Sequence, residues 1–433
     1  MTPAARLQAA IEILTEVEHG IAHGGPNAGT VIARYFKSRR YAGAKDRTAI
    51  AEQVYDVTRA RARHLWRLDR IDAKPTPRAL AIAALAADGA FDAALFSGEG
   101  YGPDALSSEE REIADKLTDG DAPLPPWAAL GVPEWLYPSL KNRFGEHLPE
   151  EMAALDAMAS TDIRANTLKA DRDDLIARLA TDGQAGTPTP FSPLGLRFAG
   201  HPRLTALASF ADGLFEVQGE SAQIAGLLVD AAPGHQVLDL CAGAGGKTLA
   251  LAAAMQNKGQ IYAADTSAKR LEALKARARR ADARNIQIRR LPSSGDKRAR
   301  MLGKLAGAMD RVVVDAPCSG SGTWRRHPDL KWRLAPDALA NHQARQLELL
   351  REGAAATRPG GRLVYMTCSI LAEENDDVVA AFLGQTEGWT LLDTGPLCPA
   401  PLESGPAPYP EALQLTPARH QTDGFFVAVL KAP

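Results

Sequence analysis

Two cysteines in the C-terminal half of the chain follow apolar runs and could do nucleophilic chemistry. Cys318 lies in Asp315-Ala316-Pro317-Cys318, and Cys368 directly follows a run that ends at Thr367. A free cysteine is most often a small buried hydrophobic residue. Two cysteines at the carboxyl ends of two predicted parallel strands, one of them after Asp-Ala-Pro, instead favour thiolate chemistry in one cleft.

Methylation of cytosine at C5 is a reaction that needs this set of groups. The C5 carbon is a poor nucleophile, and addition of a thiolate at C6 makes an enamine whose C5 can attack a methyl sulfonium. A carboxyl group near N3, such as that of Asp315, can stabilise the charge that develops. A second thiol could assist the final elimination. Spacing alone does not decide which cysteine is the nucleophile.

A glycine-rich stretch, VLDLCAGAGGKT at 237–248, is the candidate cofactor loop. It predicts a buried strand that turns tightly into a helix, and ligands of open α/β sheets bind beyond such strand ends. A phosphate-binding P-loop would need glycine at Cys241, and the dinucleotide pattern GxGxxG also fails here. S-adenosylmethionine has no phosphate and suits the acidic pair Asp239 and Asp265. The loop alone also fits a turn without any ligand.

Alternating apolar runs and helical patterns after residue 213 predict a parallel α/β sheet with helices on both faces. Strands are expected at 236–240, 260–264, 286–288, 311–315, 362–367, 390–392 and 424–430. Helices are expected at 247–256, 267–281, 336–353 and 373–383. The last strand is expected to join antiparallel at or near an edge of the sheet.

The first half of the chain predicts two smaller domains. Residues 1–118 lack strand-like alternation and predict an all-α domain, with helices at 4–18, 31–36, 47–68 and 77–87 and a break at His19-Gly20. Residues 119–126 are expected to be a linker. Residues 127–212 predict a small α+β domain with strands at 163–168 and 195–198, and 213–433 form the third domain. A Pro-rich surface loop is expected at 396–410.

Composition places the chain among ordinary globular proteins. It has 433 residues, of which 45% are hydrophobic and 24% charged, and a net charge of -2. Four cysteines without CxxC spacing predict free thiols in a reducing compartment and no metal site. Neither a secretory signal nor a run of about 20 apolar residues is present, so we expect a cytoplasmic protein without membrane contact.

Basic residues gather in the predicted helical domain. They fit a solvated helix face and an RNA-phosphate surface about equally, because phosphate contacts need only clustered Lys and Arg. These residues are Arg34, Lys37, Arg39, Arg40, Lys45, Arg59, Arg61, Arg63 and Arg67.

Three motifs taken together resemble the RNA 5-cytosine methyltransferases of the Fmu/RsmB, or Sun, type. They are VLDLCAGAGGKT, DAPCSGSGTWRRHPDLKW (315–332) and YMTCSILAEEN (365–375). The resemblance extends to RANT (164–167), FEVQGESAQ (215–223) and DGFFVA (423–428), and it covers residues 160–433. Residues 41–61 give the helical region a weaker similarity to a NusB-like RNA-binding domain. The implied fold is a NusB-like domain, a small RRM-like domain and a Rossmann-like methyltransferase domain.

The resemblance also implies a role for each matching residue. Cys368 would be the nucleophile, Cys318 would assist product release, Asp315 would contact the base near N3, and Lys247 would position Asp315 or the substrate. The implied S-adenosylmethionine site comprises Asp239, Leu240, Cys241, Ala242, Gly243, Ala244, Gly245, Gly246, Lys247, Asp265, Arg270 and Asp315. The implied RNA-binding residues are Arg164, Asn166, Arg325, Arg326 and Lys331, with Asp329 on the same path.

The implied substrate is small-subunit (16S) rRNA, and we expect a monomer. The alternatives are a tRNA substrate with the same chemistry, or an RNA-binding assembly factor that has lost the cofactor. Two departures from the family pattern bear on this choice. Leu291-Pro292 stands where an acid of the third strand usually contacts the cofactor, with Asp296 a few residues later as a possible substitute. Gly219 and Glu220 precede Ser221, whereas in the family pattern the acid usually stands one residue earlier, at the position of Gly219.

Overall fold

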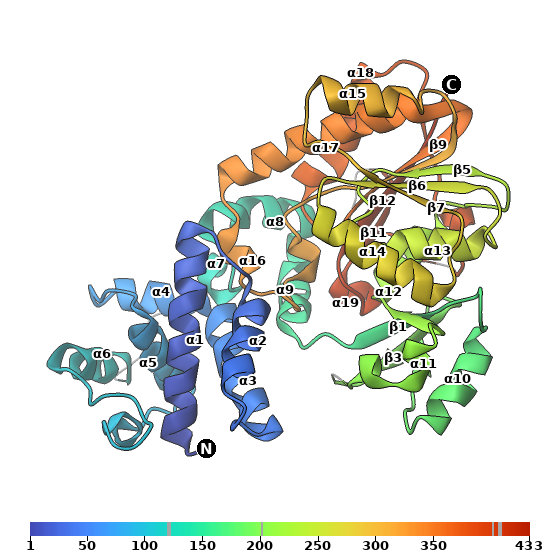
Figure 1. Cartoon of the computed structure of the whole chain (residues 1–433). Coiled ribbons are helices and arrows are strands. Elements are labelled where there is room, and N and C mark those ends of the chain that lie inside the picture. The colour runs from blue at the N-terminus through green and yellow to red at the C-terminus, as the bar shows by residue number, and fades with distance from the viewer. Residues whose placement is uncertain (119–122, 201, 401, 406–408) are drawn as a thin grey trace. The chain divides into compact units, whose positions relative to one another are not determined.

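The computed structural model describes residues 1–118, 123–200, 202–400, 402–405 and 409–433 (Figure 1). The chain divides into two compact units. The first comprises Met1–Asp156 and Trp324–Pro336, and the second comprises Ala157–Thr323 and Asp337–Pro433. The predicted linker at 119–126 and the predicted loop at 396–410 fall partly outside the described residues. Among the residues described, no helix combines the length and the apolar character needed to cross a bilayer.

The regular elements of the first unit, among its described residues, are all helices, as predicted for residues 1–118. Its α-helices are α1 (Pro3–His23), α2 (Ala28–Ser38), α3 (Ala44–Arg59), α4 (Arg61–Asp69), α5 (Pro77–Ala87), α6 (Ser108–Thr118), α7 (Pro126–Ala129), α8 (Tyr137–Phe144), α9 (Leu148–Asp156) and α16 (Leu330–Arg333). The structure therefore groups α7, α8 and α9 with the helical region, whereas the sequence placed residues 127–156 in the small domain.

The break predicted at His19-Gly20 is wrong, because α1 continues to His23. Gly20 instead allows a close approach within the unit. Its carbonyl accepts a 2.9 Å hydrogen bond from Arg333 Nη1, and a Cβ at this position would lie 3.1 Å from Arg333 Nη2. The single helix predicted at 47–68 is divided at Ala60 into α3 and α4.

The second unit contains a small antiparallel sheet with the strand order β2-β3-β1-β4. Its strands are β1 (Thr161–Ala165), β2 (Thr187–Pro188), β3 (Gly195–Phe198) and β4 (Phe215–Val217), with α10 (Arg172–Thr181) and α11 (Ala208–Ala211) beside them. Strand β1 ends three residues earlier than predicted. Strand β4 was not predicted, because three residues are too few for an alternating pattern to stand out.

The larger sheet of the second unit has the strand order β10-β12-β9-β8-β5-β6-β7, and β11 pairs with β12. The strands are β5 (Gln236–Asp239), β6 (Gln260–Asp265), β7 (Ile286–Arg290), β8 (Met309–Asp315), β9 (Thr357–Thr367), β10 (Thr390–Leu392), β11 (Leu413–Leu415) and β12 (Phe425–Lys431). Strands β5 to β9 pair in parallel, and β12 joins β9 antiparallel next to the edge strand β10. This confirms the predicted α/β architecture.

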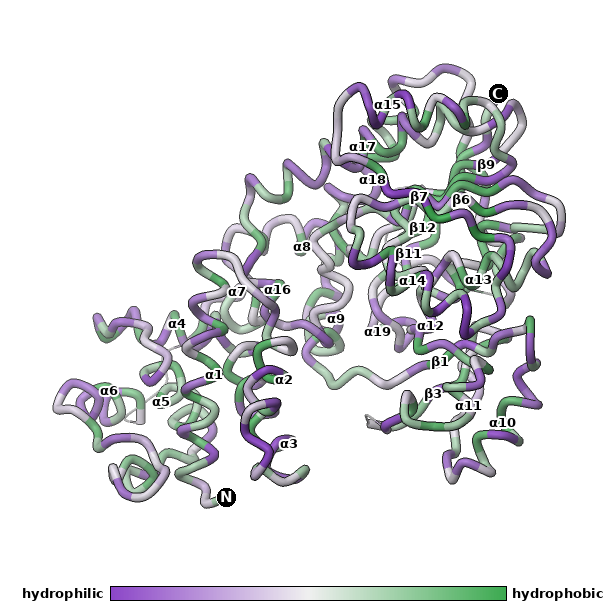
Figure 2. Tube along the Cα trace, viewed as in Figure 1, coloured by the Kyte–Doolittle hydropathy of each residue, from purple (hydrophilic) through white to green (hydrophobic). Residues whose placement is uncertain are grey.

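Helices cover both faces of the larger sheet (Figure 1). One face packs against α15 (Asp296–Gly303), α17 (Pro336–Ala356) and α18 (Asp376–Gln385), through side chains such as Leu302, Leu349 and Phe382. The other face packs against α12 (Glu220–Leu227) and α13 (Gly246–Ala254), and α14 (Ala268–Ala281) lies beside α13. Figure 2 shows the strands between these layers as mostly hydrophobic, as expected for strands buried on both faces.

Candidate active site

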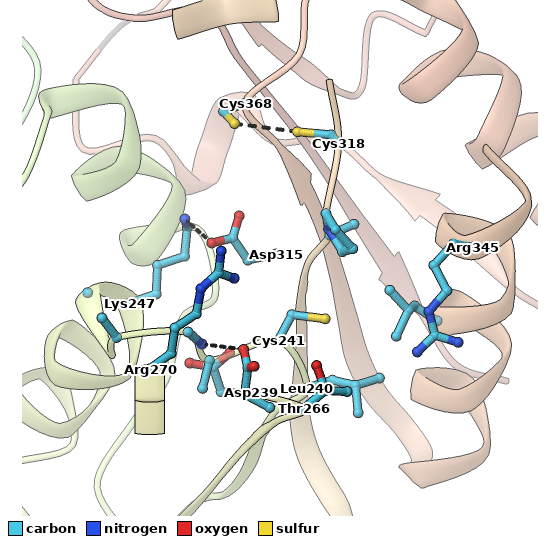
Figure 3. A pocket seen from close by; sticks show the side chains of 18 of the residues that line it. Asp239, Leu240, Cys241, Lys247, Thr266, Arg270, Asp315, Cys318, Arg345 and Cys368 are labelled. Atoms are coloured by element: carbon cyan, nitrogen blue, oxygen red, sulfur yellow. Dashed lines mark hydrogen bonds and ion pairs between the residues drawn. The ribbon is translucent and has the colours of Figure 1, made fainter. Parts of the chain in front are cut away.

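The carboxyl ends of four adjacent strands bring the predicted chemical groups to one edge of the larger sheet. Strands β5, β6, β8 and β9 end at Asp239, Asp265, Asp315 and Thr367, and a pocket of about 640 Å³ opens there (Figure 3). Most of the predicted cofactor and catalytic residues line this pocket. They are Asp239, Leu240, Cys241, Ala242, Gly243, Ala244, Gly246, Lys247, Asp265, Arg270, Asp315, Cys318 and Cys368.

Two glycines give the loop between β5 and α13 its shape. Gly243 and Gly245 have φ values of 54° and 88°, in the left-handed region that favours glycine. A Cβ at Gly245 would lie 2.7 Å from Leu274 Cγ, so a side chain there would collide with α14. The backbone N–H of Gly243 donates a 2.8 Å hydrogen bond to Asp265 Oδ2, which fixes the loop to the end of β6.

Asp239 is a buried carboxyl group at the centre of this edge. Thr248 Oγ1 donates a 2.6 Å hydrogen bond to Asp239 Oδ2. Burial raises the pKa of Asp239 to about 7. Among the described residues, its other oxygen, Oδ1, is buried without a hydrogen-bond partner. A buried acceptor of this kind fits a ligand that donates a hydrogen bond or carries positive charge.

The two cysteine thiols face each other beyond the carboxyl ends of β8 and β9 (Figure 3). Their Sγ atoms are 3.4 Å apart. The hydrogen bond with Cys368, together with burial, raises the pKa of the Cys318 thiol. Cys318 therefore keeps its proton and can donate it in the hydrogen bond to Cys368 sulfur. This geometry places a protonated thiol beside a second sulfur that is available as nucleophile.

The loops that carry the two cysteines are fastened together by short polar contacts. Ser321 and Ser369 hydroxyl oxygens lie 2.9 Å apart, and the N–H of Gly322 donates to the carbonyl of Cys368 at 2.9 Å. The Gly322 carbonyl in turn accepts a 2.8 Å hydrogen bond from the N–H of Gly424. A Cβ at Gly322 would lie 2.1 Å from Gly424 O, so only glycine fits here.

Lys247 and Asp315 form an ion pair beside the cysteines, with Nζ and Oδ2 2.7 Å apart. The Lys247 ammonium also lies 4.7 Å from the centre of the Phe425 ring, within cation–π range. Asp315 is the more exposed partner of the two. The buried lysine can therefore orient a carboxyl group that remains accessible from the pocket.

The segment that follows β7 lacks the acid that the resemblance leads one to expect, and other contacts stabilise it. Leu291 is buried in the hydrophobic core, and Asp296 is not among the residues lining the pocket. Arg298 lines it instead and makes two 2.6 Å hydrogen bonds to the Glu352 carboxylate and one of 2.9 Å to the Pro292 carbonyl. The structure therefore gives no support to Asp296 as a substitute for the missing acid.

Three residues that the sequence predicted to bind RNA are buried and contact other parts of the protein. Arg164 Nε donates to Gln218 Oε1 at 2.7 Å, and Asn166 Nδ2 donates to the carbonyls of Gly213 and Ala281, each at 2.8 Å. Lys331 Nζ is bound by Asp156 Oδ1 at 3.0 Å. The predicted RNA-binding role of Arg164, Asn166 and Lys331 stays a prediction, and these contacts show that each side chain is also used within the protein. Arg325 is also buried, and Arg326 is partly exposed.

Several residues of the site were not singled out from the sequence. Gln218, Ser293, Arg298 and Arg345 line the pocket. Only Gln218 carried a signal, since it lies in the FEVQGESAQ motif. The neighbouring Glu220 is fully buried and accepts hydrogen bonds from the N–H groups of Phe191 and Ser192, at 2.6 and 2.9 Å. Glu220 therefore ties the small domain to α12 rather than lining the pocket.

Comparison with known proteins identifies the family to which the chain is similar. Residues 227–431 match the family model described as 16S rRNA methyltransferase RsmB/F, and residues 132–205 match the model of the RsmF/B-like ferredoxin-like domain. The crystal structure of the protein PH0851 is similar over 99% of both chains, with a TM-score of 0.78 and 25% identity.

Two curated relatives are similar over 69% of the chain. The probable ribosomal RNA small subunit methyltransferase B of Synechocystis sp. is 33% identical over 305 residues, which is 69% of this chain and 66% of the relative. Ribosomal RNA small subunit methyltransferase B of Pseudomonas syringae pv. tomato is 34% identical over 300 residues, 69% of this chain and 65% of the relative. The chain thus spans just under two thirds of the length of these relatives. With the two family models covering most of residues 132–431, the chain belongs to the RsmB/F methyltransferase family.

Proposed function

We propose that the protein is an S-adenosylmethionine-dependent RNA cytosine-C5 methyltransferase that acts on small-subunit (16S) rRNA. The observation that carries this proposal is the 3.4 Å separation of the Cys318 and Cys368 sulfur atoms in a pocket shared with Asp315. Covalent activation of a pyrimidine needs a thiolate, a group at N3 and a route for releasing the thiolate. Cys368, Asp315 and Cys318, which line this pocket, are the groups that would meet these three needs.

The cofactor would be held by the loop 239–246 and by Asp265. When bound, S-adenosylmethionine supplies an electrophilic methyl group on a sulfonium. Asp239 Oδ1, which has no hydrogen-bond partner in the part of the chain that the structure describes, offers an acceptor and, when ionised, a negative charge to a cationic ligand. The turn at Gly243 and Gly246 leaves backbone open to the pocket, because neither residue has a side chain.

Cys368 would act as the nucleophile. Its thiolate adds to C6 of the cytosine, and the electron pair of the C5–C6 double bond moves to C5 and towards N3. Asp315, held by Lys247, would bind the N3 edge of the base. After methylation the C5 proton would be lost to solvent, the C5–H electron pair would re-form the C5–C6 double bond, and the sulfur–C6 bond would break with its electron pair on the Cys368 sulfur. Cys318 can stabilise the departing Cys368 thiolate by donating a hydrogen bond, so product release is the step it assists.

A second hollow next to the pocket supports an RNA substrate. It has a volume of about 420 Å³ and is lined by Thr266, Arg290, Leu291, Pro292, Ser293 and Lys297, two of which also line the main pocket. Arg290 and Lys297 are exposed, and no carboxylate is among these lining residues. Two cations and two hydroxyl groups suit a backbone phosphate of a bound strand.

The basic side of the helical unit supports RNA binding less strongly. Arg39 and Arg61 form ion pairs with Glu12 and Glu18, at 3.1 and 2.8 Å. Arg34 pairs with Glu16. Pairing with carboxylates reduces the positive potential that a phosphate backbone would meet. We therefore place the RNA path on the methyltransferase unit rather than on this helical face.

Transfer of labelled methyl groups from S-adenosylmethionine to RNA transcripts tests the proposal. We expect incorporation into 16S rRNA, which nuclease digestion and mass spectrometry identify as 5-methylcytidine, and no incorporation with Cys368→Ala. If only tRNA were methylated, the proposed rRNA substrate would be wrong, whereas the proposed reaction would stand. If calorimetry detected no binding of S-adenosylmethionine to the wild-type protein, the enzyme assignment would fail in favour of an RNA-binding assembly factor.

A further inference from the structure

A buried carboxylate lies behind the two cysteines and contacts neither of them directly. Glu374, in the motif YMTCSILAEEN, is fully buried. Its Oε1 accepts a 2.8 Å hydrogen bond from the N–H of Ser319, the residue that directly follows Cys318, and its Oε2 accepts a 2.5 Å hydrogen bond from the Ser319 hydroxyl. Gln346 of α17 donates a third hydrogen bond to Oε1 at 3.1 Å.

The backbone that carries Glu374 is itself fixed. The Tyr365 hydroxyl donates a 2.5 Å hydrogen bond to the Glu374 carbonyl. The next residue, Asn375, donates to the Ser369 carbonyl at 3.0 Å and accepts a 2.5 Å hydrogen bond from Thr367 Oγ1. Glu374 therefore belongs to the segment that carries Cys368, whereas two of the three hydrogen bonds to its carboxylate come from Ser319 in the loop that carries Cys318.

The charge of Glu374 also acts on the chemistry of the pair. A negative charge in a buried site disfavours a second negative charge close by. After the hydrogen bond with Cys368, burial and the charge of Cys368, the charge of Glu374 contributes to the raised pKa of Cys318. Loss of the carboxylate would loosen the Cys318 loop and would also make the Cys318 thiol easier to ionise.

We propose that Glu374 is a positioning residue that holds the Cys318 loop against Cys368, keeps Cys318 in its thiol form and thereby sets the rate of product release. The release step rests on the proposed function, whereas the placement and ionisation of Cys318 do not. Glu374 acts through Ser319 and does not touch the substrate.

Two variants and one control test this role. Glu374→Gln keeps the shape of the side chain but removes its charge, and Ser319→Ala removes one ligand while it leaves the charge in place. Glu387→Gln, on an exposed site of the same unit, is the matched control. The first measurement is the rate of Cys318 alkylation by iodoacetamide at pH 8 without RNA, in a Cys368→Ser background, followed by peptide mass spectrometry. The second is the half-life of the protein–RNA adduct on denaturing gels, in the Cys368 background.

We expect Glu374→Gln to raise the alkylation rate on the order of tenfold, which corresponds to about one pKa unit. We expect both variants to lengthen the adduct half-life severalfold and to leave the affinity for S-adenosylmethionine unchanged. The control Glu387→Gln should change neither the alkylation rate nor the adduct half-life. Unchanged alkylation and adduct lifetime in a folded Glu374→Gln protein would overturn the inference. If Glu374→Gln does not fold, an unchanged adduct lifetime in Ser319→Ala overturns it. Faster alkylation in a protein that methylates no RNA would support the placement of Cys318 and refute the proposed function.

Discussion

The sulfur atoms of Cys318 and Cys368 lie 3.4 Å apart, although 50 residues separate them in the sequence. They meet because β8 and β9 are parallel neighbours whose carboxyl ends open into the same pocket. At this distance the hydrogen bond with Cys368, together with burial and the charge of Cys368, raises the pKa of the Cys318 thiol. The pair therefore suits a division of roles, with one sulfur as nucleophile and the other as proton-holding partner.

Asp239→Asn is expected to stabilise the protein at pH 8 and to weaken S-adenosylmethionine binding. In the folded protein Asp239 holds its proton up to about pH 7, whereas in the unfolded chain it ionises near pH 4. The folded state therefore binds an extra proton between these values, so the stability contributed by Asp239 falls as pH rises through this window and stays low above it. Asparagine cannot ionise and avoids this loss.

Thermal melts at pH 5 and pH 8 check this prediction. The difference between Asp239→Asn and wild type should be a few degrees in favour of the variant at pH 8 and much smaller at pH 5. Calorimetry on the same samples should show weaker cofactor binding. If the melting temperatures of Asp239→Asn and wild type differed equally at the two pH values, Asp239 would be ionised at both. Unimpaired cofactor binding by Asp239→Asn would show that Asp239 does not belong to the cofactor site.

Gly245→Ala is expected to disrupt the cofactor loop. Alanine at φ 88° is strained, and its Cβ would meet Leu274 Cγ at 2.7 Å. Together these effects cost on the order of 1–3 kcal/mol, which α14 can relieve only by moving. We expect a lower melting temperature and weaker binding of S-adenosylmethionine in calorimetry.

Gly384→Ala in α18 is the matched control for this change. Its added Cβ meets no atom within 4 Å, and alanine favours the helix by roughly 0.5–1 kcal/mol. Gly384→Ala should leave cofactor binding unchanged and should not lower the melting temperature. A Gly245→Ala protein that behaves in the same way would refute the proposed constraint on the loop.

Arg290→Ala combined with Lys297→Ala is expected to weaken RNA binding without changing cofactor affinity. Each lost phosphate contact should reduce the slope of log affinity against log salt concentration by about 0.7–0.9. Fluorescence anisotropy with a labelled RNA fragment at several salt concentrations measures this slope. Arg284→Ala is the control, because Arg284 is an exposed arginine already paired with Asp282 at 2.8 Å. An unchanged slope in the double variant would place the RNA path elsewhere.

Much of the methyltransferase fold could be predicted from the sequence because several of its strands are continuous apolar runs that end in an acid or directly before a cysteine. The strand ends at Asp239, Asp315 and Thr367 were all predicted at the positions where the structure has them or within one residue. The parallel order of strands then brings these ends together without further information. Some short elements were missed: β4 and β11 have three residues each, which leaves little pattern to recognise, although β10 of the same length was predicted.

The contacts of polar side chains could not be predicted in the same way. Arg164 and Asn166 were expected at an RNA surface, but their partners are Gln218 and the carbonyls of Gly213 and Ala281, 47 to 115 residues away in sequence. A buried arginine and an exposed one look alike in a sequence. Likewise, Glu374 stood in a recognised motif, but its link to Ser319 became visible only once β8 and β9 were side by side.

The most direct test of the account uses Cys318→Ala and Cys368→Ala with 16S rRNA and S-adenosylmethionine. We predict that Cys318→Ala accumulates a covalent protein–RNA complex on denaturing gels, with mass spectrometry locating a methylated cytosine on the peptide that contains Cys368. Cys368→Ala should form no such complex and no 5-methylcytidine. A complex trapped by Cys368→Ala, with attachment at Cys318, would contradict the assignment of the two sulfur atoms.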